Sequence, residues 1–217
     1  LTALAVPSVA LAQDAAAEAA SPEGLEEIVV TAQRREESLQ KAAVAVTAVT
    51  GDELTKSGIT ETANLGRLVP SLVIQPTGGT TSFFLRGVGT NSQNSFAENA
   101  VAFNFNGVYV GRPTAPAGVF YDLERVEVVK GPQGTLFGRN TIGGTISVRH
   151  TRPTGELGGK FKARYGSFNS LDLEGVLNLP KIGDALSVKL AGLRRTSDSP
   201  TINRYTGKRE DGRDIYN

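Results

Sequence analysis

The feature that most restricts the fold of this chain is a two-residue alternation of apolar and polar side chains that begins after Pro153. The alternation is clearest over residues 160–165, and it recurs over residues 171–178 and 186–191. Successive side chains of a β-strand point to opposite faces of the sheet, whereas a helix repeats about every 3.6 residues. The pattern therefore predicts three antiparallel strands, each with one apolar and one polar face.

Two kinds of sheet would produce this alternation. A transmembrane β-barrel turns its apolar side chains to lipid and its polar side chains to a wet lumen, in segments of about ten residues. A soluble antiparallel sheet with one solvated face shows the same alternation. Three strands are also too few to close a barrel, since the smallest barrels have about eight. The alternation alone leaves both kinds of sheet open.

The N-terminus has the composition of an export signal. Its first residues are apolar over the length of a signal-peptide core, and they end in a small-x-small pattern at residues 10–12. We expect residues 1–12 to be the remnant of a signal peptide that is cleaved before Gln13. A short buried helix is the alternative, but Pro7 disfavours it. Because the sequence opens on Leu1 and contains no methionine, we also expect it to be a fragment.

Composition excludes several classes of function. The 23 Lys and Arg residues are balanced by 22 Asp and Glu residues, and no basic run forms the patch that nucleic-acid binding needs. The chain has no cysteine and one histidine, which excludes thiolate nucleophiles and cysteine-ligated or multi-histidine metal sites. We therefore expect no catalytic residues, no metal site, no cofactor and no nucleic-acid partner.

No segment has the ~18 consecutive apolar residues of a membrane-spanning helix. An exported chain with this sequence is therefore expected in the periplasm, outside the cell or in the outer membrane. Only barrels span that last compartment, because every backbone polar group in lipid must be hydrogen-bonded within the protein.

Residues 13–39 are predicted to form a linker that contains one short strand. Its first part is rich in Ala, Glu and Pro. Residues 26–32 then include a β-branched run, and the charged residues 34–37 follow it. A strand bounded in this way is expected to pair with another segment or with a partner. An ordinary first strand of the following domain is an equally good interpretation of the pattern.

Residues 40–152 are predicted to form a compact α+β domain with a small mixed sheet and short helices. One helix is expected to begin at Asp52 and end at Gly58, and a second to cover residues 60–69. The Asn-Gly pair at residues 106–107 predicts a type I′ hairpin. Strands are expected at residues 44–49, 72–74, 83–85, 103–105, 108–110, 125–130 and 145–148.

Two glycine-rich segments differ from nucleotide-binding loops. Residues 87–89 lack the third glycine and the following helix of a dinucleotide fingerprint, and residues 131–144 lack the spacing and Lys-Ser/Thr ending of a P-loop. Glu124 and Glu127 could form an acid pair, but they flank an alternating strand with basic neighbours, which favours a salt-bridged face. His150, at a strand end, is interpreted as a polar linker residue.

Three segments closely resemble the plug domain of TonB-dependent receptors. They are Phe84-Leu85-Arg86-Gly87-Val88-Gly89, Asn106-Gly107-Val108-Tyr109-Val110, and the glutamate-, valine- and glycine-rich run from Leu123 to Gly144. The last segment is highly specific, and the order of parts in the chain from residue 26 onward also resembles this family. One difference is Asn106, where the family usually has an aspartate; asparagine serves the turn equally well but carries no charge.

The resemblance implies an α+β plug domain followed by antiparallel strands of a truncated transmembrane β-barrel. The expected order is a signal-peptide remnant over residues 1–12, a periplasmic linker with the TonB box over 13–39, the plug over 40–152 and the incomplete barrel over 153–217. The family's barrels have about 22 strands. The implied TonB box, which would bind the partner, comprises Glu27, Ile28, Val29, Val30, Thr31 and Ala32.

Two further sets of residues are implied by the same resemblance. Contacts between plug and barrel are assigned to Arg86, Arg125 and Arg139. A structural role in tight turns is assigned to the motif glycines, which are Gly87, Gly131, Gly134, Gly138, Gly143 and Gly144.

The resemblance also implies a function. Receptors of this family bind a scarce solute outside the cell and are opened by TonB from the periplasm. We expect the outer membrane as location, active uptake as function, a ferric siderophore as solute, and TonB and membrane lipid as partners. TonB would add the segment 27–32 as a strand, through backbone hydrogen bonds. The alternatives are a soluble exported α+β binding protein and a secreted hydrolase built on a carboxylate pair.

Overall fold

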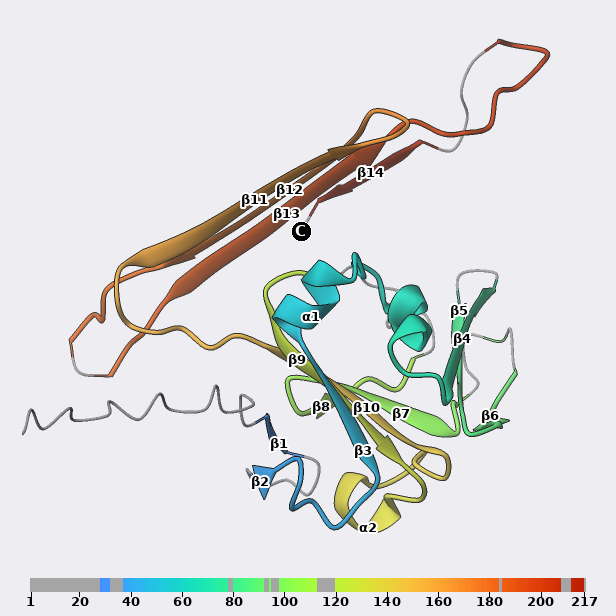
Figure 1. Cartoon of the computed structure of the whole chain (residues 1–217), viewed down its shortest axis with the longest axis vertical. Helices are drawn as coiled ribbons and strands as arrows, with labels where there is room; N and C mark the ends of the chain where they lie inside the picture. Colours follow the sequence, from blue (N-terminus) through green and yellow to red (C-terminus); the bar gives the residue numbers. More distant parts are fainter. Residues whose placement is uncertain are drawn as a thin grey trace, which may run out of the picture.

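The computed structural model describes residues 28–31, 37–77, 80–91, 94, 98–112, 120–183, 185–207 and 212–216. The described residues form an α+β domain and, after it in sequence, a four-stranded antiparallel sheet that extends alongside the domain (Figure 1). The predicted signal peptide lies outside the described residues, as does most of the predicted linker.

A five-stranded mixed sheet lies at the centre of the α+β domain, in the order β3-β9-β10-β7-β8. Its strands are β3 (Val46–Thr50), β7 (Val101–Phe105), β8 (Val108–Tyr109), β9 (Leu123–Lys130) and β10 (Gly144–His150). β10 is parallel to β7, and the other pairs are antiparallel. Asn106 and Gly107 join β7 to β8 with φ of 49° and 84°, which is the backbone that a type I′ turn requires.

Shorter elements surround this sheet. They are β1 (Val29–Val30), β2 (Glu37–Ser38), α1 (Gly51–Lys56), the 3₁₀ helix η1 (Thr62–Arg67), β4 (Leu72–Thr77), β5 (Thr80–Leu85), β6 (Val88–Gly89) and α2 (Gly134–Phe137). Helix α1 is capped by Thr50 and not, as predicted, by Asp52. The extended backbone of Thr50 lets its Oγ1 accept a hydrogen bond from the Glu53 backbone N–H at 3.2 Å. The sequence pattern did not predict α2.

The main core lies on one face of the five-stranded sheet. Val126 and Val128 of β9 and Ile146 of β10 are at most 1% exposed and face this core. Phe83 of β5 stacks on Phe103 of β7, with ring centroids 5.7 Å apart. The alternation of β9 therefore directs its other side chains, at positions 125, 127 and 129, to the opposite face of the sheet.

The C-terminal sheet consists of β11 (Gly158–Gly166), β12 (Ser170–Asn178), β13 (Lys189–Ser197) and β14 (Arg213–Tyr216). The predicted antiparallel alternation is confirmed, but the bounds of the third strand were wrong. That strand was expected over residues 186–191 and instead begins at Lys189, because Ile182 and Leu186 form a β-bridge within the preceding loop. β14 was not predicted.

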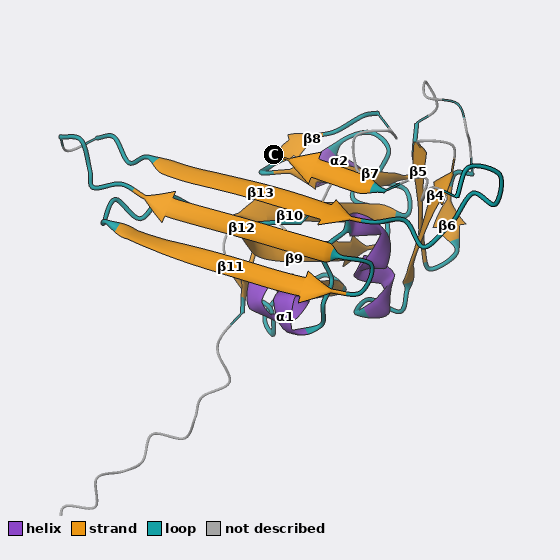
Figure 2. Cartoon of the chain, turned by 90° about the horizontal axis from the view of Figure 1, so that it is seen from above, coloured by secondary structure: helices purple, strands orange, loops and turns teal. Residues whose placement is uncertain are grey.

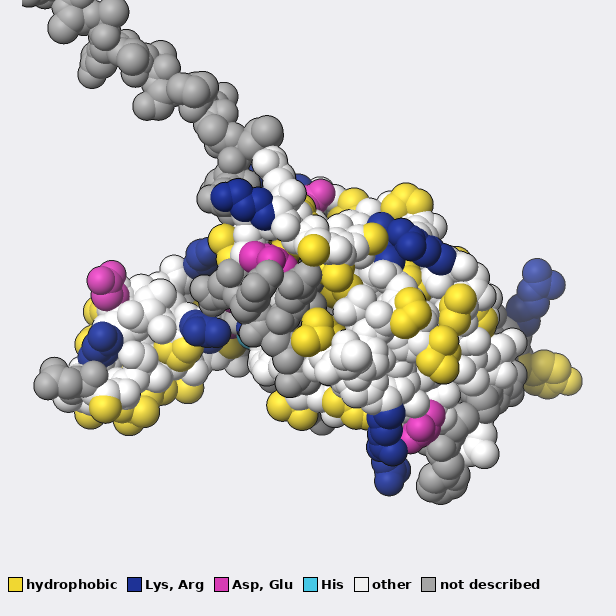
Figure 3. Space-filling view, turned by 90° about the horizontal axis from the view of Figure 1, so that it is seen from below, with side chains coloured by type: hydrophobic (Ala, Val, Ile, Leu, Met, Phe, Trp, Pro, Cys, Tyr) yellow, Lys and Arg dark blue, Asp and Glu magenta, His cyan; other side chains and the backbone are white. Residues whose placement is uncertain are grey.

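The two faces of this sheet differ in chemistry. Phe161 and Tyr165 of β11 are 73% and 71% exposed, and Leu190 of β13 is 58% exposed, all on the face away from the domain. Lys162 and Glu174 lie on the opposite face, which covers α1 and the region of β9 (Figure 2). Seen from below, the side of the α+β domain that faces away from the sheet carries Lys and Arg side chains at scattered positions (Figure 3). Among the described residues, no helix is long and apolar enough to span a membrane.

At Gly144, the first residue of β10, there is no room for a side chain beside β9. Its φ is +137°, and a Cβ atom at this position would lie 2.2 Å from the carbonyl oxygen of Val129 and 2.6 Å from Leu85 Cδ2. An alanine would thus have to adopt a backbone conformation that L-residues avoid and displace a backbone atom.

We therefore predict that Gly144→Ala destabilises the α+β domain by roughly 1–3 kcal/mol. Gly175→Ala on β12 is the matched control, because nothing lies within 4 Å of its Cβ position. The measurement is the urea concentration at which the domain of the full-length protein becomes sensitive to protease. Equal urea midpoints for the two variants would show that β10 does not pass as close to Val129 at Gly144 as the structure indicates.

Candidate functional site

The segment Ile28–Thr31 is held against the second face of the five-stranded sheet. β1 pairs with β2 in the register Val29↔Ser38 and Val30↔Glu37. Val30 is fully buried and packs with Val129 of β9. The predicted box residues Ile28, Val29, Val30 and Thr31 are thus brought together in one extended segment, while Glu27 and Ala32 lie outside the described residues.

A buried carboxylate fixes the end of this segment. The Thr31 backbone N–H donates to Glu127 Oε1 at 2.9 Å, and Thr31 Oγ1 lies 3.1 Å and 3.2 Å from the two oxygens of the same carboxylate. Glu127 is only 1% exposed. Arg125 Nε donates to Oε1 at 2.7 Å from the same strand. These are charge-assisted hydrogen bonds, which are stronger than neutral ones.

The three predicted contact arginines lie at separate places in the α+β domain. Arg125 forms ion pairs with Glu124 and Glu127. Arg139 forms an exposed ion pair with Glu98 at 3.1 Å. Arg86 lies in the turn between β5 and β6, with φ of 53°, and its N–H donates to the Ser71 carbonyl at 2.8 Å.

No hydrogen bond or ion pair joins these three arginines to β11–β14 in the described part of the chain, so their contact with a barrel stays a prediction. Five of the six motif glycines lie outside the strands, whereas Gly144 is the first residue of β10. Gly87 follows Arg86 in its turn. Gly131, Gly134, Gly138 and Gly143 lie between β9 and β10, with Gly134 at the start of α2.

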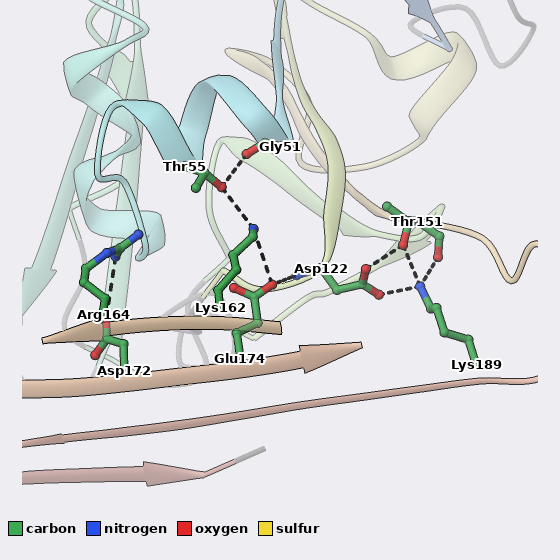
Figure 4. A network of polar contacts seen from close by, with 9 residues as sticks. All are labelled: Gly51, Thr55, Asp122, Thr151, Lys162, Arg164, Asp172, Glu174 and Lys189. Atoms are coloured by element: carbon green, nitrogen blue, oxygen red, sulfur yellow. Dashed lines mark hydrogen bonds and ion pairs between the residues drawn. The ribbon is translucent and has the colours of Figure 1, made fainter. Parts of the chain in front are cut away.

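Other residues connect the domain to the C-terminal sheet (Figure 4). Lys189 at the start of β13 forms an ion pair with Asp122, and its Nζ donates to Thr151 Oγ1 at 2.8 Å. The side chains of Lys189 and Asp122 are 10% and 7% exposed. Thr151 Oγ1 also lies 2.6 Å from Asp122 Oδ1, and the Asp122 N–H donates to Glu174 Oε1 at 3.1 Å. Asp122 therefore contacts both β12 and β13.

Two further contacts extend this interface toward the helices. Lys162 Nζ donates to Thr55 Oγ1 of α1 at 3.4 Å (Figure 4). Arg195 is held by Asp172 within the sheet at 2.9 Å and reaches Glu61 of the domain at 3.4 Å. The sequence indicated the polar face of these strands but not their partners. The sequence around Asp122 and Glu61 has no periodic motif that predicts these contacts, because the positions of both residues depend on tertiary packing.

His150 belongs to the same region and is not the simple linker residue that we predicted. Its ring lies 4.6 Å from the ring of Phe105 and 5.7 Å from that of Tyr121. Partial burial lowers the pKa of His150 and outweighs the opposing effect of Asp122, while Lys189 lowers it further. The imidazole is thereby favoured in its neutral form.

The contacts of Glu127 and Asp122 hold parts of the chain in position and do not form a catalytic centre. Among the described residues, no group of three or more His, Cys, Asp or Glu could hold a metal ion. Glu124 and Glu127, the candidate acid pair, both contact Arg125. Glu127 is also enclosed by Thr31, which leaves no room for a substrate at that carboxylate.

A comparison with protein families matches residues 38–145 to the TonB-dependent receptor plug domain. The chain is 30% identical over 207 residues to the pesticin receptor of Yersinia pestis, covering 94% of this chain and 29% of that protein. It is 32% identical over 124 residues to the vitamin B12 transporter BtuB of Vibrio vulnificus, covering 56% of this chain and 20% of the transporter. The chain thus spans less than a third of these relatives.

Solved structures agree with the sequence comparison. The ferric yersiniabactin uptake receptor FyuA from Yersinia pestis superimposes with a TM-score of 0.69 at 31% identity, over 78% of this chain and 27% of that receptor. The ferripyoverdine receptor of Pseudomonas aeruginosa has a TM-score of 0.64 at 18% identity, over 79% of this chain and 23% of its own. The second likeness concerns the fold alone.

The contact at Asp122 yields a prediction. Asp122→Asn would leave the nearly buried Lys189 ammonium without its counter-charge. The free energy needed to separate the α+β domain from the sheet should therefore fall by roughly 1–3 kcal/mol. Glu98→Gln is the control, because it breaks only the exposed pair with Arg139, which contributes about 0–1 kcal/mol. For both variants of the full-length protein, the measurement is the urea concentration at which the α+β domain becomes sensitive to protease. A larger effect of Glu98→Gln would contradict the assigned interface.

Proposed function

The chain belongs to the TonB-dependent receptor family through its plug domain, and from this premise we propose that the full-length protein takes up a ferric siderophore across the outer membrane. Members of this family are outer-membrane receptors and not enzymes, which removes the soluble binding protein and the secreted hydrolase as alternatives. Uptake, solute and partner are proposed here because the chain spans only part of its relatives.

The observation that carries this proposal is the contact between the plug and β11–β13. A charged face of the sheet holds the plug through Lys189, Lys162 and Arg195, while the opposite face exposes Phe161 and Tyr165. A wall that is apolar outside and polar inside fits a barrel in lipid. The exposed contact of Lys162 with Thr55 contributes little, whereas the nearly buried pair of Asp122 and Lys189 supplies the firm attachment between plug and sheet.

The choice of an iron complex rests on relatives. FyuA from Yersinia pestis is a ferric yersiniabactin uptake receptor, and its structure is matched at 31% identity. The vitamin B12 transporter of Vibrio vulnificus matches a smaller share of this chain. Ferric yersiniabactin is therefore the first solute to test, and cobalamin is the matched alternative.

We predict that deleting the full-length gene from its host abolishes ⁵⁵Fe accumulation from at least one member of a ferric siderophore panel that includes ferric yersiniabactin. Cyanocobalamin accumulation, measured in the same strain, should be unchanged. Restoring the gene on a plasmid is the control for secondary effects of the deletion. Loss of cobalamin uptake with normal iron uptake would contradict the proposed solute class.

We further propose that TonB binds residues 27–32, including Ile28, Val29, Val30 and Thr31, by adding them as a strand. The extended backbone of β1 supports this, because strand addition recognises backbone hydrogen-bonding groups and tolerates varied side chains. Contacts of Arg86, Arg125 and Arg139 with further barrel strands are part of the same proposal.

The strand-addition model predicts opposite outcomes for two substitutions at Val29. Val29→Pro removes one N–H and restricts the preceding residue, so energised uptake should be lost while solute binding at the cell surface stays almost unchanged. Val29→Ile keeps the strand and should be nearly silent. Uptake and binding of the labelled solute are measured on the same cells. A parallel loss of both would mean that the segment is only a structural strand of the plug.

A further inference from the structure

The proposed TonB box is paired with β2 along one edge and is held at Thr31 on the other. We infer that Glu127 is a latch that holds the box on the plug, so that this carboxylate competes directly with TonB for the segment. The inference rests on the proposed binding of TonB at residues 27–32. It adds the residue that controls access to that segment.

The first edge of the box is occupied by β2. Besides the β1–β2 register, the Leu39 N–H donates to the Ile28 carbonyl at 2.9 Å. Backbone groups of alternate residues in a strand point to opposite edges. Ile28 and Val30 therefore direct their backbone groups to β2, and Val29 and Thr31 direct theirs away from it.

The second edge is capped at Thr31 by Glu127. The Thr31 N–H, which points away from β2, is the group that donates to Glu127 Oε1. A partner that adds a strand at this edge needs the same N–H for its own backbone carbonyl. TonB therefore cannot pair through Thr31 while Glu127 holds it, and the opposite edge requires displacement of β2.

Glu127 is suited to release the box without becoming an isolated buried charge. Its contact with Arg125 Nε lies within β9 and does not depend on the box. When Thr31 leaves, the carboxylate keeps this charged partner and gains access to water. A buried carboxylate that lost every partner would instead prevent release. The arrangement therefore stabilises the docked box strongly while permitting the undocked state.

Val30 supplies the second part of the docking. Glu127 and Val129 lie two residues apart on the same face of β9, so they contact the segment at neighbouring points. Val129 gives apolar contact to Val30, and Glu127 gives the directional contact to Thr31. Removing the carboxylate charge should thus loosen the box without abolishing its apolar contact.

The test uses the full-length receptor with Val30→Cys as reporter, because Val30 is fully buried when the box is docked. Glu127→Gln keeps the shape of the side chain and removes its charge. It is expected to raise the maleimide labelling rate at position 30 by about tenfold, which corresponds to about 1.4 kcal/mol. The affinity of the soluble C-terminal domain of TonB, measured on receptors with native Val30, is expected to rise by a similar factor.

Glu124→Gln is the matched control. It removes the other carboxylate partner of Arg125 but no group that contacts Thr31, so labelling and TonB affinity should stay within about twofold of the parent. If Glu127→Gln does not reach the membrane, the labelling rate at position 30 is measured in Thr31→Val instead. This substitution deletes only the hydroxyl contact and is expected to raise labelling about threefold.

The outcomes separate the latch from the proposed partner. Unchanged labelling in Glu127→Gln, or in Thr31→Val where that variant decides, would overturn the latch. Faster labelling together with higher TonB affinity supports it. Faster labelling without TonB binding to any variant would leave the latch in place as a docking contact and would refute the TonB assignment of the segment.

Discussion

The two-residue alternation of β9 is the constraint on which the rest of this structure depends. Val126 and Val128 fill the main core, whereas Arg125, Glu127 and Val129 lie on the other face. A strand with only apolar side chains would bury both faces and leave no directional contact for the N-terminal segment. Because β9 is an inner strand of its sheet, its first face stabilises the plug and its second face positions the segment Ile28–Thr31.

The start of β9 lies next to the contact with the barrel wall. Asp122, immediately before this strand, contacts both Lys189 and Glu174, and Glu127 lies five positions further along the chain. The wall contact and the box contact are thus attached to one continuous strand. Both contacts are buried, since Lys189 and Asp122 are 10% and 7% exposed and Glu127 is 1% exposed. Lys162 and Arg139, by contrast, make exposed contacts of low energy.

Much of the fold could be predicted because it depends on local pattern. The alternation of β11 to β13 and the Asn106-Gly107 turn are short-range signals, and the structure confirms both. The start of β13 was missed because the bridge between Ile182 and Leu186 is formed by tertiary geometry that period-two reasoning ignores. The cap of α1 was placed at Asp52 because Thr50 has an extended conformation that composition does not show.

The candidate site was less predictable. The β-branched run at residues 28–31 indicated a strand, but its partners could not be read from the pattern. Glu37 and Ser38 have little strand propensity, and Glu127 is separated from Thr31 by 96 positions. Long-range polar contacts of this type have no local periodicity. The family resemblance indicated the plug, and the geometry then showed which residues hold the segment Ile28–Thr31 against it.

If the C-terminal sheet is part of a barrel wall, one of its faces meets lipid while the other holds the plug. Nitroxide labels on single cysteines along β12, in the full-length receptor reconstituted in lipid vesicles, test it directly. Labels at Leu171, Leu173 and Leu177 are expected to collide with dissolved oxygen and to be shielded from a water-soluble nickel reagent. Labels at Asp172 and Glu174 should be poorly accessible to oxygen. Equal accessibility of both sets to the nickel reagent would show that the sheet is solvated on both faces and does not meet lipid.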